Sequence, residues 1–385
     1  MKKVLIKLLI IIILLSIGQS FVYAENEINI QQDMKDIYQE TGLKEIISKY
    51  AIDSQVEEEI QELLDDDIIT SSKKIINLSP KNIINSLWLK IKKNIQEPIK
   101  LSIGVLAIVL VTALMEMLKE CFSNNSTNEI INSISIISVF ITIAYPILQC
   151  IRSGIDTIVN ISNFMIGFIP VYSGIMTTCG KIFTGAVYNS FLFCFCQVIS
   201  QIISSKILPV MNIYMAFCLV SSLTPHLNIS NAAKTVKNVI TWVLGFIISA
   251  FVGLITIQGI VASSADTVGT KTAKFVIGSA VPIIGSVVSD AYLSVKACFD
   301  FLRSSVGAIS IIFIVMSFLP ILIKLTVWML TIKLSSGIAE FVGVKQVAEI
   351  LKSSSYVISL LFAIIVCYIL LIVITTTVMI ILGLG

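Results

Sequence analysis

Apolar runs of about 20 residues recur along most of this chain, and they constrain its fold more than any other feature. Of the 385 residues, 56% are hydrophobic and only 13% are charged, roughly half the charged share of an average soluble domain. A soluble core of this size cannot hide so much apolar surface. Because lipid offers the backbone no hydrogen-bond partners, runs that cross it must form helices. The sequence therefore predicts an all-α, polytopic integral membrane protein.

The region 99–385 is predicted to be the membrane domain, with about seven to nine spans of ~20 residues each. The favoured spans are residues 99–118, 130–149, 158–178, 182–204, 207–224, 239–262, 305–332 and 356–382. Segment 275–295 predicts either a full span or a broken, re-entrant element, because glycines and a proline interrupt it. Apolar residues at helical spacing in 334–351 predict an amphipathic helix that either lies flat on the membrane or packs ordinarily.

The N-terminus has the pattern of a cleaved export signal. Three lysines within the first seven residues precede a short apolar stretch at 8–17, and Val22 and Ala24 occupy the −3 and −1 positions. We expect residues 1–24 to be a signal peptide cut after Ala24. An uncleaved N-terminal anchor is the alternative reading.

Residues 25–98 differ from the rest of the chain in charge. They contain 15 acidic and 9 basic residues, whereas 99–385 contains 9 acidic and 15 basic residues. Apolar residues recur at helical spacing in 56–68 and 83–95. This segment is therefore predicted to be a small exported helical region. It serves either as a cap on the membrane domain or as a docking surface for an exported partner.

No sequence motif of an enzyme is evident. The single histidine, His226, makes histidine-based catalysis or a histidine-rich metal site hard to build, and most of the eight cysteines lie in apolar runs. No phosphate loop, nucleophile elbow or dinucleotide fingerprint is present. We therefore expect no enzymatic activity, no catalytic or metal-binding residue and no cofactor. The net charge of +3 gives no reason to expect a nucleic-acid partner, so the lipid bilayer is the expected environment.

Residues 265–292 form the most distinctive stretch, because charged side chains flank an apolar part that contains helix breakers. Transporters and channels build midplane sites from such interrupted segments. The part of this stretch from Phe275 to Pro282 is weakly similar to residues 164–170, which also begin with Phe and end with Pro. An internal repeat is therefore one possible reading. The candidate structural or pore residues are Asp266, Lys271, Lys274, Gly278, Pro282, Gly285 and Asp290.

On this stretch the chain resembles the stage III sporulation protein AE family of endospore-forming bacteria. The resemblance is carried by Ala-Asp-Thr at 265–267, Thr-Ala-Lys-Phe at 272–275, Pro-Ile-Ile-Gly at 282–285 and Ser-Asp-Ala at 289–291. The layout of signal peptide, acidic exported segment and polytopic remainder is similar as well.

The resemblance implies a subunit of the channel-like complex that links the mother cell to the engulfed forespore and is needed for late forespore gene expression. Its implied location is the mother-cell membrane around the forespore. The implied partners are other proteins of the same operon, including an ATPase and ring-forming proteins, and a forespore membrane protein. Two other readings stay open: a stand-alone secondary transporter, and a membrane-embedded enzyme using Asp266 and Asp290.

Overall fold

The computed structural model describes residues 42–50, 92, 96, 98–100, 102–114, 125–202, 205–206, 208–223, 229–280 and 285–384. Within these ranges the chain is helical and contains no strand, which confirms the predicted all-α class. A shorter apolar helix covers Pro98–Leu114. The labelled helices are α3 (Leu43–Tyr50), α7 (Asn125–Thr178), α8 (Ile182–Ile202), α9 (Leu208–Leu223), α10 (Ile229–Ala280), α11 (Gly285–Phe341) and α12 (Lys345–Leu384). The predicted signal peptide and most of 25–98 lie outside the described residues.

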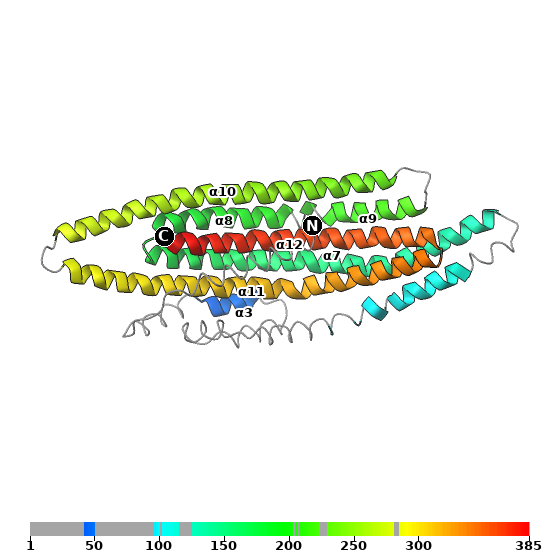
Figure 1. Cartoon of the computed structure of the whole chain (residues 1–385), viewed down its shortest axis with the longest axis horizontal. Coiled ribbons are helices and arrows are strands. Elements are labelled where there is room, and N and C mark those ends of the chain that lie inside the picture. The colour runs from blue at the N-terminus through cyan, green and yellow to red at the C-terminus, as the bar shows by residue number, and fades with distance from the viewer. Residues whose placement is uncertain are drawn as a thin grey trace.

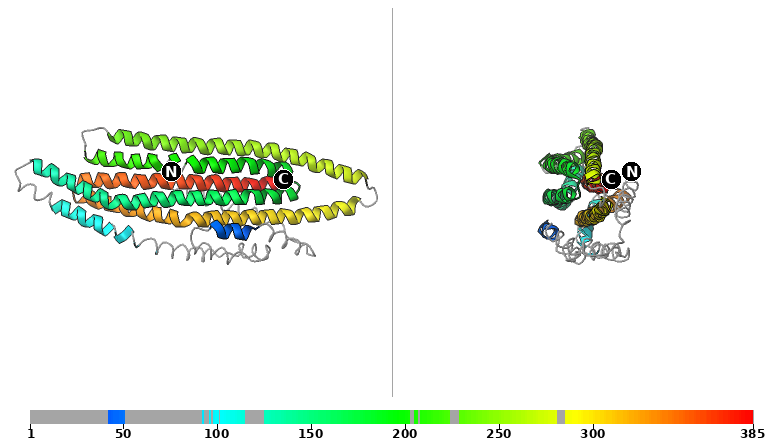
Figure 2. Two further views of the ribbon diagram at one scale, coloured as in Figure 1. Left: turned by 180° about the vertical axis from the view of Figure 1, so that it is seen from behind. Right: turned by 90° about the vertical axis from the view of Figure 1, so that its left-hand side faces the viewer.

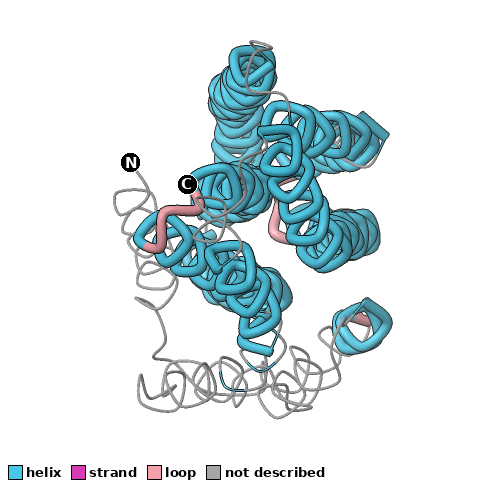
Figure 3. The backbone as a smooth tube through the Cα atoms, turned by 90° about the vertical axis from the view of Figure 1, so that its right-hand side faces the viewer, coloured by secondary structure: helices cyan, strands magenta, loops and turns pink. Residues whose placement is uncertain are grey.

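The long helices form one elongated bundle in which helices joined by a turn, such as α7 and α8 or α11 and α12, run antiparallel, whereas α12 runs parallel to its neighbours α7 and α10 (Figure 1). Helix α12 contacts each of α7, α8, α9, α10 and α11, and views along the bundle show it at the centre (Figures 2 and 3). Its central place follows from its sequence, which is the most apolar of the candidate spans. A helix that is apolar on all sides is stabilised by being surrounded by other helices.

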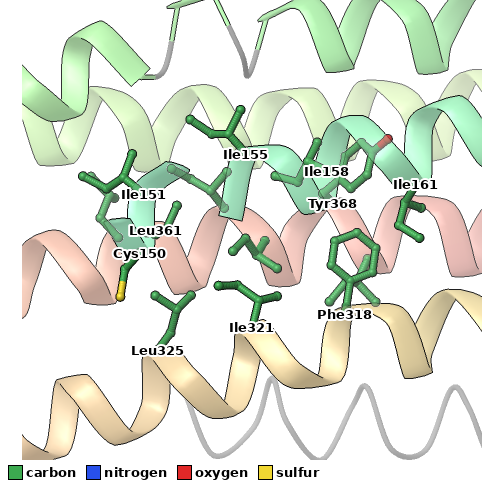
Figure 4. Packing of buried hydrophobic residues seen from close by; sticks show 14 of the residues in the cluster. Cys150, Ile151, Ile155, Ile158, Ile161, Phe318, Ile321, Leu325, Leu361 and Tyr368 are labelled. Atoms are coloured by element: carbon green, nitrogen blue, oxygen red, sulfur yellow. The ribbon is translucent and has the colours of Figure 1, made fainter. Parts of the chain in front are cut away.

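The core between α7, α11 and α12 is apolar along its length. In Figure 4, Ile151, Ile155 and Ile158 of α7 face the central helix, and Phe318 and Ile321 of α11 approach it from the other side. Aromatic rings continue this packing, since the ring centroids of Phe164 and Phe313 are 4.4 Å apart. The interior of the bundle is therefore a packed hydrophobic core at this level.

The helices α7, α10, α11 and α12 are far longer than the spans expected from the sequence, with 54, 52, 57 and 40 residues. At 1.5 Å per residue, the 54 residues of α7 extend about 80 Å, against a hydrocarbon core of about 30 Å. Five described helices are long and apolar enough to cross a membrane. The expected spans 130–149 and 158–178 are both parts of the single helix α7, so their separation was wrong.

Gly154 shows why the two expected spans form one helix. It lies in the polar stretch between them, which was expected to be a loop. The structure uses it for close packing: a Cβ at Gly154 would lie 3.0 Å from Ile365 Cδ1 and 3.3 Å from Leu361 Cδ1 on α12. A glycine inside a membrane helix commonly permits such an approach of two backbones. It therefore marks a helix contact here rather than a break.

Replacing Gly154 with valine is expected to push α7 away from α12 and to destabilise the protein by about 1–3 kcal/mol, as overpacking of a core does. The temperature at which half of the monodisperse peak is lost in size-exclusion chromatography after heating measures this effect. Ile365→Val removes the Cδ1 atom nearest to the new side chain and should recover part of the loss. An unaltered midpoint in Gly154→Val would contradict the close packing.

The expected amphipathic helix at 334–351 is not a separate element, which corrects that prediction. Helix α11 continues to Phe341, a turn follows, and α12 begins at Lys345. Gly343 has φ +94°, a left-handed conformation that ends helices and that residues with a Cβ rarely adopt. The apolar residues that suggested one helix are thus divided between the ends of two long ones.

The turns α7–α8 and α11–α12 have the same construction. The segments 173–180 and 336–343 both read Ser-Gly-Ile followed, after four residues, by a glycine with positive φ. In both, the amide three residues after the helix end bonds back five positions along the chain: Lys181 N to Met176 O, 2.9 Å, and Val344 N to Ala339 O, 3.0 Å. In both, the serine hydroxyl donates to a carbonyl twelve residues later, that of Gly185 or that of Ala348.

These two turns lie at opposite ends of the bundle (Figure 1). Each turn is also contacted by the helix that precedes the other pair of helices. At the α7–α8 turn, Asp266 of α10 bonds to the start of α8. Near the α11–α12 turn, the hydroxyl of Ser102, in the Pro98–Leu114 helix, lies 2.9 Å from the hydroxyl of Ser335 of α11. The described helices thus contain an inverted repeat of residues 98–221 and 261–384, related by an offset of 163 positions, and the part of α10 before residue 261 lies outside it. The echo between 164–170 and 275–282 does not correspond to this repeat, because those segments are 111 positions apart.

Candidate functional site: a buried polar cluster at the turn between α7 and α8

The cluster starts from the way α7 ends. Gly180 has φ +79°, and its amide donates to Thr177 O at 3.0 Å, which reverses the chain within three residues. Helix α8 then begins at Ile182 with its first amide groups lacking partners in their own helix, as at any helix N-terminus. This end carries a partial positive charge.

Asp266 of α10 lies more than eighty residues further along the chain, and its carboxylate accepts hydrogen bonds from two of these amides. Its Oδ1 accepts the amide of Phe183 and its Oδ2 accepts the amide of Thr184, both at 2.9 Å. The side chain is buried, with 3% exposure. A carboxylate at this position compensates both the unmet donors and the helix dipole, so Asp266 fixes α10 to the α7–α8 turn.

Ser173 and Gly185 join the two helices of the turn on their facing sides. The hydroxyl of Ser173 donates to Gly185 O at 2.8 Å in a buried position. A Cβ at Gly185 would lie 3.1 Å from Ser173 O and 3.2 Å from Thr177 Oγ1. The absence of a side chain at Gly185 is therefore what allows α7 and α8 to approach this closely.

A buried arginine lies beside this turn. Arg303 of α11 has no exposed surface, and its Nη2 is 3.1 Å from Asp300 Oδ1. The hydroxyl of Tyr172 lies 3.2 Å from the Cβ position of Gly307, one helical turn beyond Arg303 on α11, and Tyr188 of α8 is buried as well. Both tyrosine hydroxyls are buried and make no hydrogen bond with the described part of the chain.

The cluster is chemically suited to binding rather than to catalysis. It combines a guanidinium with two phenol groups, all of them hydrogen-bond donors, which would attract water or an anion. It contains no pair of nucleophile and base of the kind that covalent catalysis requires. Within the residues the structure describes, no group of three or more His, Cys, Asp and Glu side chains is arranged to hold a metal ion.

The sequence-predicted site residues are distributed along the joined ends of α10 and α11. Only Asp266 lies in the cluster, while Lys271 is exposed one turn further along α10. Lys274 and Gly278 belong to the last turns of α10; Gly285 is the first residue of α11, and Asp290 follows in its second turn. Pro282 and Ala24 lie outside the described residues.

Sequence reasoning missed most of the cluster, because its members come from four helices and no motif joins them. Arg303 lies just outside the predicted span 305–332, yet it is fully buried. Tyr172, Ser173 and Tyr188 lie within apolar runs where tyrosine and serine are unremarkable. The repeated Ser-Gly-Ile-x₄-Gly pattern was the one available signal for the turn itself.

Comparison with known proteins gives one family. The family model described as stage III sporulation protein AE matches residues 60–383. A curated stage III sporulation protein AE from Bacillus subtilis (strain 168) is 20% identical over 235 residues, which cover 61% of this chain and 59% of the relative. The match thus spans about three fifths of that relative's length. No solved structure matches.

Proposed function

Because the chain belongs to the stage III sporulation protein AE family, we propose that it is a non-enzymatic membrane subunit of a channel-like complex between mother cell and forespore. The observation that carries the proposal is the match of the family model over 60–383, a region that contains the five described helices able to cross a membrane. A helical bundle without a catalytic constellation fits a structural subunit of such an assembly.

The shape of the bundle supports a role in assembly. Helices α10 and α11 extend beyond the α7–α8 turn and meet in a projecting hairpin (Figure 1). The described residues that carry the family resemblance lie on the two helices of this hairpin, at 265–267 and 272–275 of α10 and at 285 and 289–291 of α11. A projecting hairpin is suited to contacting another subunit, and Asp266 holds its base against α8. We propose that the hairpin either contributes to the transport pathway of the complex or docks onto another subunit.

We further propose that the subunit resides in the mother-cell membrane around the forespore, with residues 25–98 on the exported side. Its partners there are the ATPase and ring-forming proteins of its operon and a forespore membrane protein. Late forespore gene expression then depends on the assembled complex.

A stand-alone secondary transporter is the second candidate, and the inverted repeat is the observation that favours it. Many transporters are built from two inverted units, with the transported ion or solute bound between them near the bilayer midplane. Here the space between α7, α11 and α12 is filled by apolar side chains (Figure 4). The channel-subunit reading therefore remains the conclusion. Solute uptake by the purified protein in liposomes would support the transporter instead.

A deletion strain of the source bacterium tests the proposed function. Engulfment should complete, but late forespore gene expression should fail and heat-resistant spores should fall by several orders of magnitude. Engulfment and forespore expression are scored separately by membrane staining and a forespore reporter. Normal spores together with altered solute uptake in growing cells would overturn the proposal.

Complementation of the deletion strain locates the function on the chain. Pro282→Ala and Asp290→Asn are expected to reduce spore formation while the protein remains in the membrane at normal levels. Ile257→Val, at an exposed apolar position of α10, is the control and should restore sporulation. Full restoration by both hairpin variants would contradict a role for the hairpin.

A further inference from the structure

One face of α7 carries a row of polar side chains that points away from the bundle core. Its members lie three or four positions apart, so they fall on one side of the helix: Tyr145, Gln149, Arg152, Asp156, Asn160 and Asn163. Arg152, Asp156 and Asn163 are exposed, and Gln149 Nε2 donates to Tyr145 Oη at 2.8 Å. We call this row the α7 polar stripe.

The stripe lies at the depth of the most apolar part of the bundle. Gly154, between Arg152 and Asp156, packs against Leu361 and Ile365, which lie at the middle of the apolar stretch Lys345–Ile381 of α12. The stripe extends about 14 Å to either side of this level along α7, which is within the ~15 Å half-thickness of a hydrocarbon core. Exposed there to lipid, a guanidinium and a carboxylate would be strongly disfavoured.

The inverted repeat shows that the fold itself does not require a polar face at this place. The positions of the second unit that correspond to Arg152, Asp156 and Asn160, at the offset of 163, are apolar: Val315, Leu319 and Ile323. Both units build the same turn with different residues at these positions of α7 and α11. The polar stripe is thus a property of the first unit alone, and no contact within the described part of a single copy pairs its charges.

The charges of the stripe are self-complementary. It presents one cation and one anion a single helical turn apart, and neither Arg152 nor Asp156 forms an ion pair within the described part of the chain. Copies of one chain share their orientation in a membrane, so two copies meeting here would pack their α7 helices side by side and parallel. The Asp156 of the other copy would then lie one helical turn, about 6 Å along the axis, from each Arg152, within reach of the long arginine side chain.

We propose that the α7 polar stripe is an interface with a second copy of this chain, which pairs these charges across a polar seam inside the membrane. The seam removes the guanidinium and carboxylate from lipid, and the amides of Asn160 and Asn163 extend it with hydrogen bonds between helices. This inference does not depend on the sporulation role, since it rests on the depth and charge of the stripe.

Charge reversal tests the interface in the full-length protein, with the mass of the particle measured in lipid nanodiscs. Wild-type protein should be an oligomer. Arg152→Asp places like charges against each other and should weaken association at least tenfold, whereas Arg152→Asp with Asp156→Arg restores opposite charges and should restore the oligomer. Lys333→Glu, an exposed charge elsewhere on α11, should leave the mass unchanged. A monomeric wild type, or a double variant no better than the single one, would overturn the proposal.

Disulfide cross-linking in native membranes gives an independent test. In a variant with the eight native cysteines replaced by alanine, Asn163→Cys should form a homodimer on mild oxidation. Ile257→Cys, exposed on α10, should not. Equal cross-linking at the two positions, or linkage of residue 163 only to another polypeptide, would show that a second copy does not occupy the stripe.

Discussion

Replacing Asp266 with alanine is expected to be the most destabilising single change in the described part of the protein. The carboxylate accepts two backbone amides at the start of α8 and is buried. Its removal leaves both donors without an acceptor in a region that water does not readily reach. Hydrogen bonds to charged groups contribute about 1.5–3 kcal/mol each, and the helix dipole adds to this. We expect a loss of about 2–4 kcal/mol.

The amount of folded protein in the membrane and the heating midpoint in detergent measure this loss. Asp266→Asn keeps one acceptor oxygen but loses the charge, so its effect should be intermediate. Glu349→Ala removes an exposed carboxylate from α12 and serves as the matched control. A midpoint for Asp266→Ala equal to that of the control would show that the link between α10 and α8 does not stabilise the bundle.

Replacing Gly185 with valine is expected to have the second largest effect. The new Cβ would meet Ser173 O at 3.1 Å, and a backbone oxygen cannot rotate away as the end of a side chain can. The side chain also separates the Ser173 hydroxyl from the Gly185 carbonyl, now 2.8 Å apart. Together these effects should cost about 2–3 kcal/mol.

The heating midpoint again gives the measurement, with Gly253→Val as the control because no atom lies within 4 Å of a Cβ at that position of α10. Gly185→Ala should fall between the two, since it adds the close Cβ contact without the further methyl groups. If Gly185→Val and Gly253→Val melted together, the close approach of α7 and α8 would not be important for stability.

The polar stripe and the buried cluster show why part of the site could not be predicted. Arg152 and Arg303 look alike in sequence, as charges between apolar runs, and both lie outside the predicted spans. The structure buries Arg303 completely and leaves Arg152 exposed on the outer face of a continuous helix. The difference depends on helix rotation and on neighbours distant in sequence, which hydropathy does not reveal.

The sequence by itself determined the all-helical class and the apolar segments. Backbone groups in lipid must form their hydrogen bonds within the protein, and apolar runs of this length satisfy them by forming helices. The sequence also carried the family resemblance at 265–292 and identified Asp266 as one of seven candidate structural or pore residues. Only the tertiary structure decided that α7 is one helix, that Asp266 caps α8, and that the bundle contains two inverted units. Those features follow from contacts such as Gly154 with Ile365 and Asp266 with Phe183, which join residues far apart in the chain and leave no periodic signal in it.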